Sequence, residues 1–167
     1  LDLLTAEFRS SRRLRPAIAF QEALLERAAS RPAGLPTNAD EQAILDNLAP
    51  QYLRLGGMYA DERNRIRAAT AYEQYLESTP AQSAAEGTPE RAEFLQIQRG
   101  LADRHFLHTG RLARSAELYR AYLQSRPAIP AANAPDGATP AAVRARALRQ
   151  TEDFQVYERL AAIERRG

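Results

Sequence analysis

The two histidines of the chain, His105 and His108, are its best candidates for metal chemistry. They stand three residues apart, so both could lie on one face of a helix, and Asp103 is close to them in the sequence. A protein metal site needs three or four ligands in a fixed geometry, and no clear third ligand accompanies this pair. We therefore expect a structural or surface role for both histidines and predict that the protein holds no metal.

The other side chains offer little catalytic chemistry. The chain has no cysteine and no lysine, which excludes thiolate and Schiff-base chemistry. No serine-centred elbow, glycine-rich phosphate loop or zinc-binding H-E-x-x-H segment occurs. Acidic pairs such as Asp61-Glu62 are adjacent residues, which point to different faces of a helix and suit paired acid–base work poorly. The sequence therefore predicts a protein that is not an enzyme and has no cofactor.

Charge is distributed unevenly along the chain. Arginine supplies all 23 basic residues, and the net charge is +2. In residues 111–167 ten arginines stand against six acids, a local excess of +4. Nucleic-acid-binding surfaces usually carry a denser basic patch with interleaved aromatic residues, so this composition argues against a nucleic-acid partner. A regulatory or nucleic-acid-associated module that uses the basic C-terminal third stays open as an alternative.

Three prolines mark the ends of helical segments. Pro32, Pro80 and Pro127 are 48 and 47 residues apart, and each follows a segment with apolar residues at helical spacing. Linkers rich in alanine, proline, glycine and asparagine come next, and they lead to helix-start signals such as Thr88-Pro89. No segment has the pattern of a strand. The predicted helices cover residues 2–10, 16–30, 39–60, 64–78, 89–108, 111–125 and 140–165.

The segment from residue 52 to residue 80 has the most regular pattern, and it resembles a tetratricopeptide repeat. The matching positions are Tyr52, Leu55, Gly56 and Tyr59 in a first helix, and Ala68, Tyr72 and the closing Pro80 in a second. In this family the small residue at Gly56 permits close approach of the neighbouring helix. Two positions depart from the family: Tyr75 stands where alanine is usual, and Arg63 where a turn glycine is common.

A second unit over residues 97–127 matches less fully. The residues that fit are Phe106, Gly110, Tyr119, Leu123 and Pro127. Arg99, Ala102, Asp103 and Ser115 replace the aromatic, leucine, glycine and alanine of the family pattern. The period is about 47 residues instead of the usual 34. The chain thus resembles a divergent tetratricopeptide repeat protein with long linkers.

The resemblance implies an all-α fold of tandem helix-turn-helix repeats, stacked as a short right-handed α-solenoid. We predict a single helical-repeat domain over residues 1–167. Its parts are a degenerate repeat at 1–36, the best repeat at 37–80, a second repeat at 88–127, and a terminal or capping helix at 139–167. In this last helix the apolar residues Phe154, Tyr157, Leu160 and Ala161 predict one buried side.

In the tetratricopeptide family the first helices line a concave groove that takes peptides. When the groove positions of the family are transferred to this chain, the resemblance implies that the groove consists of Leu53, Arg54, Gly57, Ala60, Asp61, Leu101, Arg104, Leu107 and His108. Arg54 and Arg104 could donate charge-assisted hydrogen bonds to an acidic ligand. If charge reversal of both arginines left the affinity for the partner unchanged, this hypothesis would fail.

These patterns together predict a non-catalytic scaffold or adaptor that binds a protein or peptide partner. A structural self-assembly unit, a homo-oligomer formed through the terminal helices, is a further alternative. No apolar run approaches the roughly 18–20 residues needed to span a bilayer. The expected compartment stays open between the cytoplasm and the exterior, the latter after removal of a signal peptide.

Overall fold

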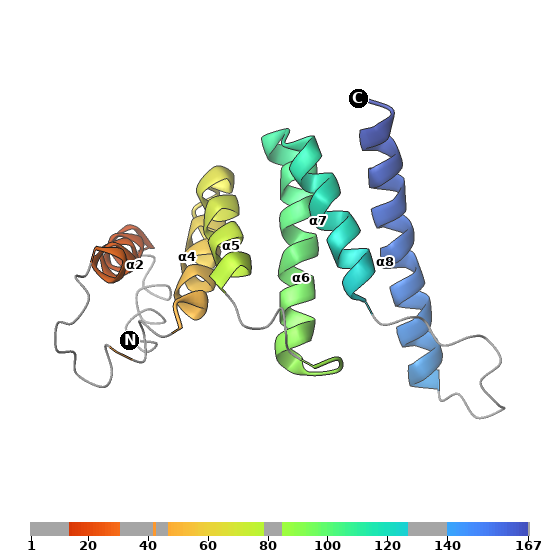
Figure 1. The fold of residues 1–167 in the computed structure, drawn as a ribbon, viewed down its shortest axis with the longest axis horizontal. Coiled ribbons are helices and arrows are strands. Elements are labelled where there is room, and N and C mark those ends of the chain that lie inside the picture. Colours follow the sequence, from red (N-terminus) through yellow and green to blue (C-terminus); the bar gives the residue numbers. More distant parts are fainter. Residues whose placement is uncertain (1–13, 31–41, 43–46, 79–84, 127–139, 167) are drawn as a thin grey trace. The chain divides into compact units, whose positions relative to one another are not determined.

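The computed structural model of the protein is all-helical in the residues that it describes, which are 14–30, 42, 47–78, 85–126 and 140–166 (Figure 1). The chain divides into two compact units, Leu1–Ala84 and Ala85–Gly167, and we describe each by itself. Unit 1 contains α2 (Leu14–Ala29), α4 (Ala49–Asp61) and α5 (Arg65–Ser78). Unit 2 contains α6 (Pro89–Arg104), the π-helical turn η2 (His105–Thr109), α7 (Leu112–Ser125) and α8 (Pro140–Glu164).

In unit 1, α4 and α5 form a helical hairpin, and α2 packs against α4. The core of this unit consists of Ala17, Ile18, Leu25, Leu55, Met58, Tyr59, Ala68 and Ala71. One polar contact crosses it: the Gln21 side chain, which is 1% exposed, donates from Nε2 to Oε1 of Gln51 over 2.9 Å. This bond satisfies two buried amides and joins α2 to α4.

The two helices of this hairpin pack closely at Gly56 and Tyr72. A Cβ atom added to Gly56 would lie 2.7 Å from Cε1 and 2.8 Å from Cδ1 of the Tyr72 ring. Only a residue without a side chain leaves room for the tyrosine, as the sequence pattern predicts for the Leu55-Gly56 pair.

The turn between α4 and α5 satisfies the last carbonyl groups of α4. The Asn64 amide donates to the Tyr59 carbonyl over 2.9 Å, and the Arg63 amide donates to the Ala60 carbonyl over 3.0 Å. These two bonds form a Schellman motif, which requires a left-handed residue, and Arg63 has a φ of 61°. Asn64 then caps α5, because its Oδ1 accepts from the Arg67 amide over 3.3 Å.

In unit 2, α7 packs against both α6 and α8. The predicted cap of α6 is confirmed: Thr88 has extended backbone angles, and its hydroxyl accepts from the Arg91 amide over 3.3 Å. The core includes Phe94, Leu101, Ala102, Leu118, Tyr119, Tyr122 and Val156.

The two hairpins repeat the same local structure at a spacing of 47 residues. Gly110 has a φ of 68° and occupies the left-handed turn position that Arg63 occupies in unit 1. Asp103 and Tyr119 stand 47 residues after Gly56 and Tyr72. The predicted period is therefore present in the structure of the hairpins.

Four of the predicted helices are confirmed with boundaries within two residues: 16–30, 64–78, 111–125 and 140–165. The predicted helix 89–108 is present as α6 followed by the π-helical turn η2. The prediction of one continuous helix over 39–60 is wrong, because Asn47 and Leu48 are not helical and α4 begins at Ala49. The predicted helix at 2–10 lies outside the described residues. The stacking of the repeats into one right-handed solenoid stays a prediction, since the units are described separately.

The structure corrects the predicted burial in the last helix. Phe154 and Tyr157 are 61% and 59% exposed, while Leu160 is buried as predicted. The buried face of α8 is instead centred on Val156, which is fully buried.

Replacing Gly56 with alanine should lower the free energy of unfolding by about 1–3 kcal/mol, because the new methyl group overlaps the Tyr72 ring. In a Tyr72→Leu background the overlap is relieved. The higher helix propensity of alanine, about 1 kcal/mol over glycine, should then make Gly56→Ala neutral or stabilising. Urea unfolding followed by circular dichroism measures both effects, and an equal loss in the two backgrounds would contradict the packing argument.

Replacing Arg63 with glycine should raise the free energy of unfolding by about 0.5–1 kcal/mol, because glycine adopts the left-handed conformation without steric cost. Gly110→Ala makes the converse change at the equivalent turn and should lower it. Thermal and urea unfolding of both variants provide the comparison. A loss of stability in Arg63→Gly would show that the arginine side chain contributes more than its backbone strain costs.

Candidate functional site

The predicted groove residues of α4 lie on a partly open face of unit 1. Leu53, Arg54, Gly57 and Ala60 are half-buried, and Asp61 is exposed. Arg54 donates from Nη1 to Oε1 of the buried Gln51 over 3.3 Å, so it also supports the core of the unit.

The predicted groove residues of unit 2 differ widely in exposure. Leu101 is 1% exposed and belongs to the core, which corrects its prediction as a groove residue. Leu107 is 57% exposed, His108 is exposed, and Arg104 is half-buried. Because the two sets of residues lie in different units, a groove that combines them stays a prediction.

The two histidines do not share a helix face. His105 is completely buried, with its Nδ1 2.9 Å from Oγ1 of Thr109, whereas His108 is exposed. The π-helical turn explains the difference, because its wider i→i+5 spacing separates residues that an α-helix would bring together. In the described part of the chain no three His, Cys, Asp or Glu residues are grouped so that they could hold a metal ion.

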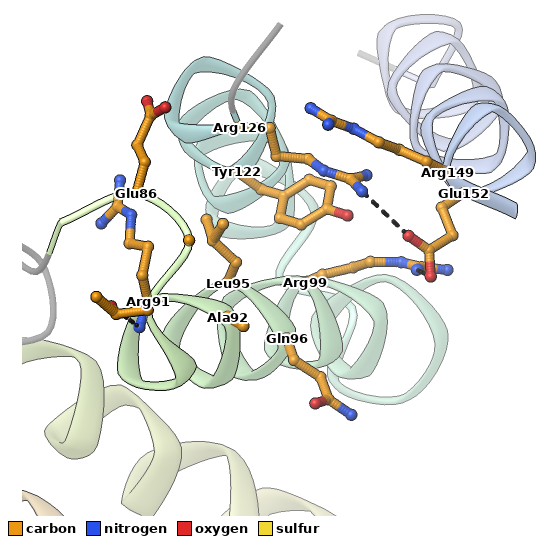
Figure 2. A pocket seen from close by; sticks show the side chains of 12 residues that line it. Glu86, Arg91, Ala92, Leu95, Gln96, Arg99, Tyr122, Arg126, Arg149 and Glu152 are labelled. Carbon is orange, nitrogen blue, oxygen red and sulfur yellow. Dashed lines mark hydrogen bonds and ion pairs between the residues drawn. The ribbon is translucent and has the colours of Figure 1, made fainter. Parts of the chain in front are cut away.

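A candidate site is a pocket of about 580 Å³ within unit 2 (Figure 2). It opens between α6, α7 and α8, and residues just before α6 complete its wall. Leu95, Ala92 and Tyr122 supply apolar surface. The full lining comprises Glu86, Gly87, Thr88, Arg91, Ala92, Leu95, Gln96, Arg99, Tyr122, Arg126, Arg149 and Glu152.

Four arginines and two glutamates line this pocket, so its charge is positive. Glu152 is shared by two of the arginines: its Oε1 is 2.9 Å from Nη1 of Arg99, and its Oε2 is 3.3 Å from Nη2 of Arg126. Arg126 also pairs with Asp153. These pairs hold the guanidinium groups of Arg99 and Arg126 in place.

Arg126 also lies over the ring of Tyr122, with its Cζ 4.9 Å from the ring centre, a distance at which cation–π attraction operates. Burial raises the pKa of Tyr122, so its hydroxyl stays protonated at neutral pH. The pocket therefore offers a fixed guanidinium and a neutral phenol side by side.

Arg149 differs from the other arginines of the pocket. Its Nε is buried and has no hydrogen-bond partner, although buried donors in proteins are nearly always paired. Figure 2 shows its side chain extending from α8 toward Arg126. Arg149 also lines the pocket, so its guanidinium group can donate to an anion bound there.

A group of three side chains fixes the position of α8 against the other helices. The Tyr119 hydroxyl donates to Oδ1 of Asp103 over 2.5 Å, and Arg159 donates to the same carboxylate and to the Tyr119 oxygen, the latter over 3.2 Å. Asp103 comes from α6, Tyr119 from α7 and Arg159 from α8. This contact holds the helix that carries Arg149 and Glu152.

The sequence did not single out the pocket arginines. Arg99 was identified only as a departure from the repeat pattern, and Arg126 and Arg149 only as members of the basic C-terminal third. The local charge excess in residues 111–167 pointed toward Arg126 and Arg149 but not toward Arg99. Their convergence depends on α8 returning to α6 and α7, which the sequence pattern does not specify.

Comparison with protein-family models, curated proteins and solved structures found no match to the chain. The resemblance to tetratricopeptide repeats therefore stays an interpretation of the residues and their spacing.

The stability of the protein should fall as the pH rises above 10, and Tyr119 should be one cause. Burial, followed by the hydrogen bond to Asp103, raises the pKa of Tyr119 above its ordinary value of 10.0. Tyr119 therefore stabilises the folded state fully below pH 10, and this contribution is lost as the pH rises toward the higher folded-state pKa.

Urea unfolding between pH 8 and pH 11 measures this effect. Tyr119→Phe should make the decline of the unfolding free energy shallower by up to about 1.4 kcal/mol per pH unit, the value for one proton. Tyr157→Phe is the control, since Tyr157 is 59% exposed. An identical slope in Tyr119→Phe and the unchanged protein would contradict the assignment.

Proposed function

We propose that the protein is a non-catalytic protein-interaction module that binds an acidic segment of a partner peptide in the arginine-lined pocket of unit 2. The observation that carries the proposal is the buried, unpartnered Nε of Arg149 in a pocket with four arginines and two glutamates. A carboxylate supplies the acceptors that such donors lack, and guanidinium–carboxylate bonds are among the stronger hydrogen bonds in proteins.

The size and lining of the pocket favour a peptide side chain next to an apolar neighbour. A volume of about 580 Å³ lies within the range of sites that enclose small ligands. The apolar surface of Leu95 and Tyr122 adjoins the arginines, so an aspartate or glutamate beside a leucine or phenylalanine fits both parts. Affinity would come from the arginine contacts together with burial of the apolar neighbour.

The same lining argues against a nucleic-acid backbone as the ligand. Glu86 and Glu152 interrupt the positive charge, and they would repel phosphates spaced regularly along a strand. A discrete acidic side chain avoids this repulsion, because it needs only one position near Arg149.

Fluorescence anisotropy with a labelled peptide in which Asp-Glu pairs flank a leucine tests the proposal. The same peptide with Asn and Gln in place of the acids is the matched ligand control. Arg149→Gln should weaken binding of the acidic peptide by roughly tenfold, the loss of one charge-assisted hydrogen bond. Arg165→Gln removes the same charge from an exposed position outside the pocket and should change the affinity by less than about twofold.

Three results would contradict the proposal. Equal weakening by Arg149→Gln and Arg165→Gln would indicate unspecific charge attraction. Tighter binding of single-stranded RNA with a steep salt dependence would favour the nucleic-acid alternative. Loss of peptide binding on charge reversal of Arg54 and Arg104, with Arg149→Gln unaffected, would place the site in the groove expected from the repeat resemblance.

A further inference from the structure

One face of α8, beside its buried side, carries a stripe of mostly apolar residues. The stripe consists of Val143, Ala147, Gln150, Phe154, Tyr157 and Ala161. Val143, Phe154 and Tyr157 are 55%, 61% and 59% exposed, and Ala147 and Gln150 are also exposed. Val156 and Leu160, the buried residues of the helix, are not part of the stripe. The stripe is therefore separate from the surface by which α8 packs on α7.

The spacing of the α8 stripe is that of a two-helix seam. Its members follow one another at intervals of four, three, four, three and four residues. This alternation is the a/d pattern of a coiled coil, with Ala147, Phe154 and Ala161 at a positions and Val143, Gln150 and Tyr157 at d positions. Such a pattern keeps contact with a second straight helix of the same kind.

We propose that the α8 stripe pairs with the α8 stripe of a second copy of the chain, in antiparallel orientation. The residues of the stripe are arranged symmetrically about residue 152, so that an isologous contact is geometrically allowed. Ala147 then faces Tyr157 of the second copy, and Val143 faces Ala161. Small residues meet large ones, which lets the two helices approach closely.

The charges beside the stripe favour this orientation. Arg144 and Glu158 lie at e positions along the same edge, and both are exposed. Antiparallel pairing brings e positions together, so each Arg144 meets Glu158 of the other copy, and the symmetry forms this ion pair twice. Parallel pairing would form no such ion pair, because it brings Glu158 beside Asp153 of the second copy. Antiparallel pairing places the two Asp153 side chains near the symmetry axis, where each pairs with Arg126 of its own chain. The second copy thus supplies both the apolar and the charged complement of the stripe.

The stripe sets the expected strength of the dimer. From residue 143 to residue 161 it runs about 27 Å along the helix. A helix pair of this length contributes less area than stable dimer interfaces usually bury, so we expect a dimer that dissociates on dilution. The pocket faces another side of α8 through Arg149 and Glu152, and peptide binding there does not depend on this contact.

Sedimentation equilibrium of the full chain over a range of concentrations tests the self-association. The unchanged protein should shift from monomer to dimer as its concentration rises. Phe154→Glu should raise the dissociation constant by at least about a hundredfold, because it places a charge in the seam. A monomer at every concentration, or a dimer that Phe154→Glu leaves intact, would overturn the proposal. Circular dichroism confirms that the variant is folded.

A charge swap tests the orientation. Arg144→Glu and Glu158→Arg should each raise the dissociation constant by roughly tenfold, because each change places like charges together at two symmetric sites. The double variant should restore the original value. Failure of the double variant to recover would contradict the facing of Arg144 and Glu158.

Disulfide trapping provides an independent readout, since the chain has no cysteine of its own. A mixture of the Val143→Cys and Ala161→Cys proteins should form the mixed disulfide under mild oxidation. Each single variant alone should cross-link poorly. Strong cross-linking of Val143→Cys with itself would show a parallel arrangement and overturn the antiparallel pairing.

Discussion

The hydrogen bonds among Asp103, Tyr119 and Arg159 are the contact on which unit 2 depends. They join one side chain from each of α6, α7 and α8 around a single carboxylate. Tyr119 is buried, and Asp103 and Arg159 are only partly accessible to water, so the bonds are stronger than the same bonds at a free surface. Because this contact positions α8, it determines where Arg149 and Glu152 meet the arginines of α6 and α7. It also determines which face of α8 remains outside.

In unit 1 the two helices of the hairpin pack by a different contact. At the position equivalent to Asp103 it has Gly56, and the ring of Tyr72 rests directly on the glycine backbone. A tyrosine thus faces the first helix in both hairpins. Tyr72 packs on Gly56, which has no side chain, and Tyr119 donates a hydrogen bond to Asp103. The second hairpin therefore has a hydrogen-bonded contact at the position where the first hairpin has close packing. That contact allows a third helix to join through Arg159.

The two surfaces that carry the proposals lie on different sides of α8. One side turns Arg149 and Glu152 toward α6 and α7, and another side presents Phe154 and Tyr157. In the described residues no helix is long and apolar enough to cross a membrane. A helix that packs through a narrow face of Val156 and Leu160 leaves the rest of its surface for binding. This arrangement lets a peptide and a second copy of the chain bind α8 without competing.

The amino-acid sequence alone determined where the helices lie in the chain and the spacing at which they recur. The signals are Thr88 before Pro89, the closing prolines and the 47-residue period. They can be recognised in the sequence because they depend on local backbone preferences. The tertiary structure decided everything that depends on which helices meet. It placed His105 inside and His108 outside through a π-helical turn, buried Leu101, exposed Phe154 and Tyr157, and gathered the pocket arginines. A long arginine or an aromatic residue fits either a core edge or an open surface, and only the neighbouring helix decides between them.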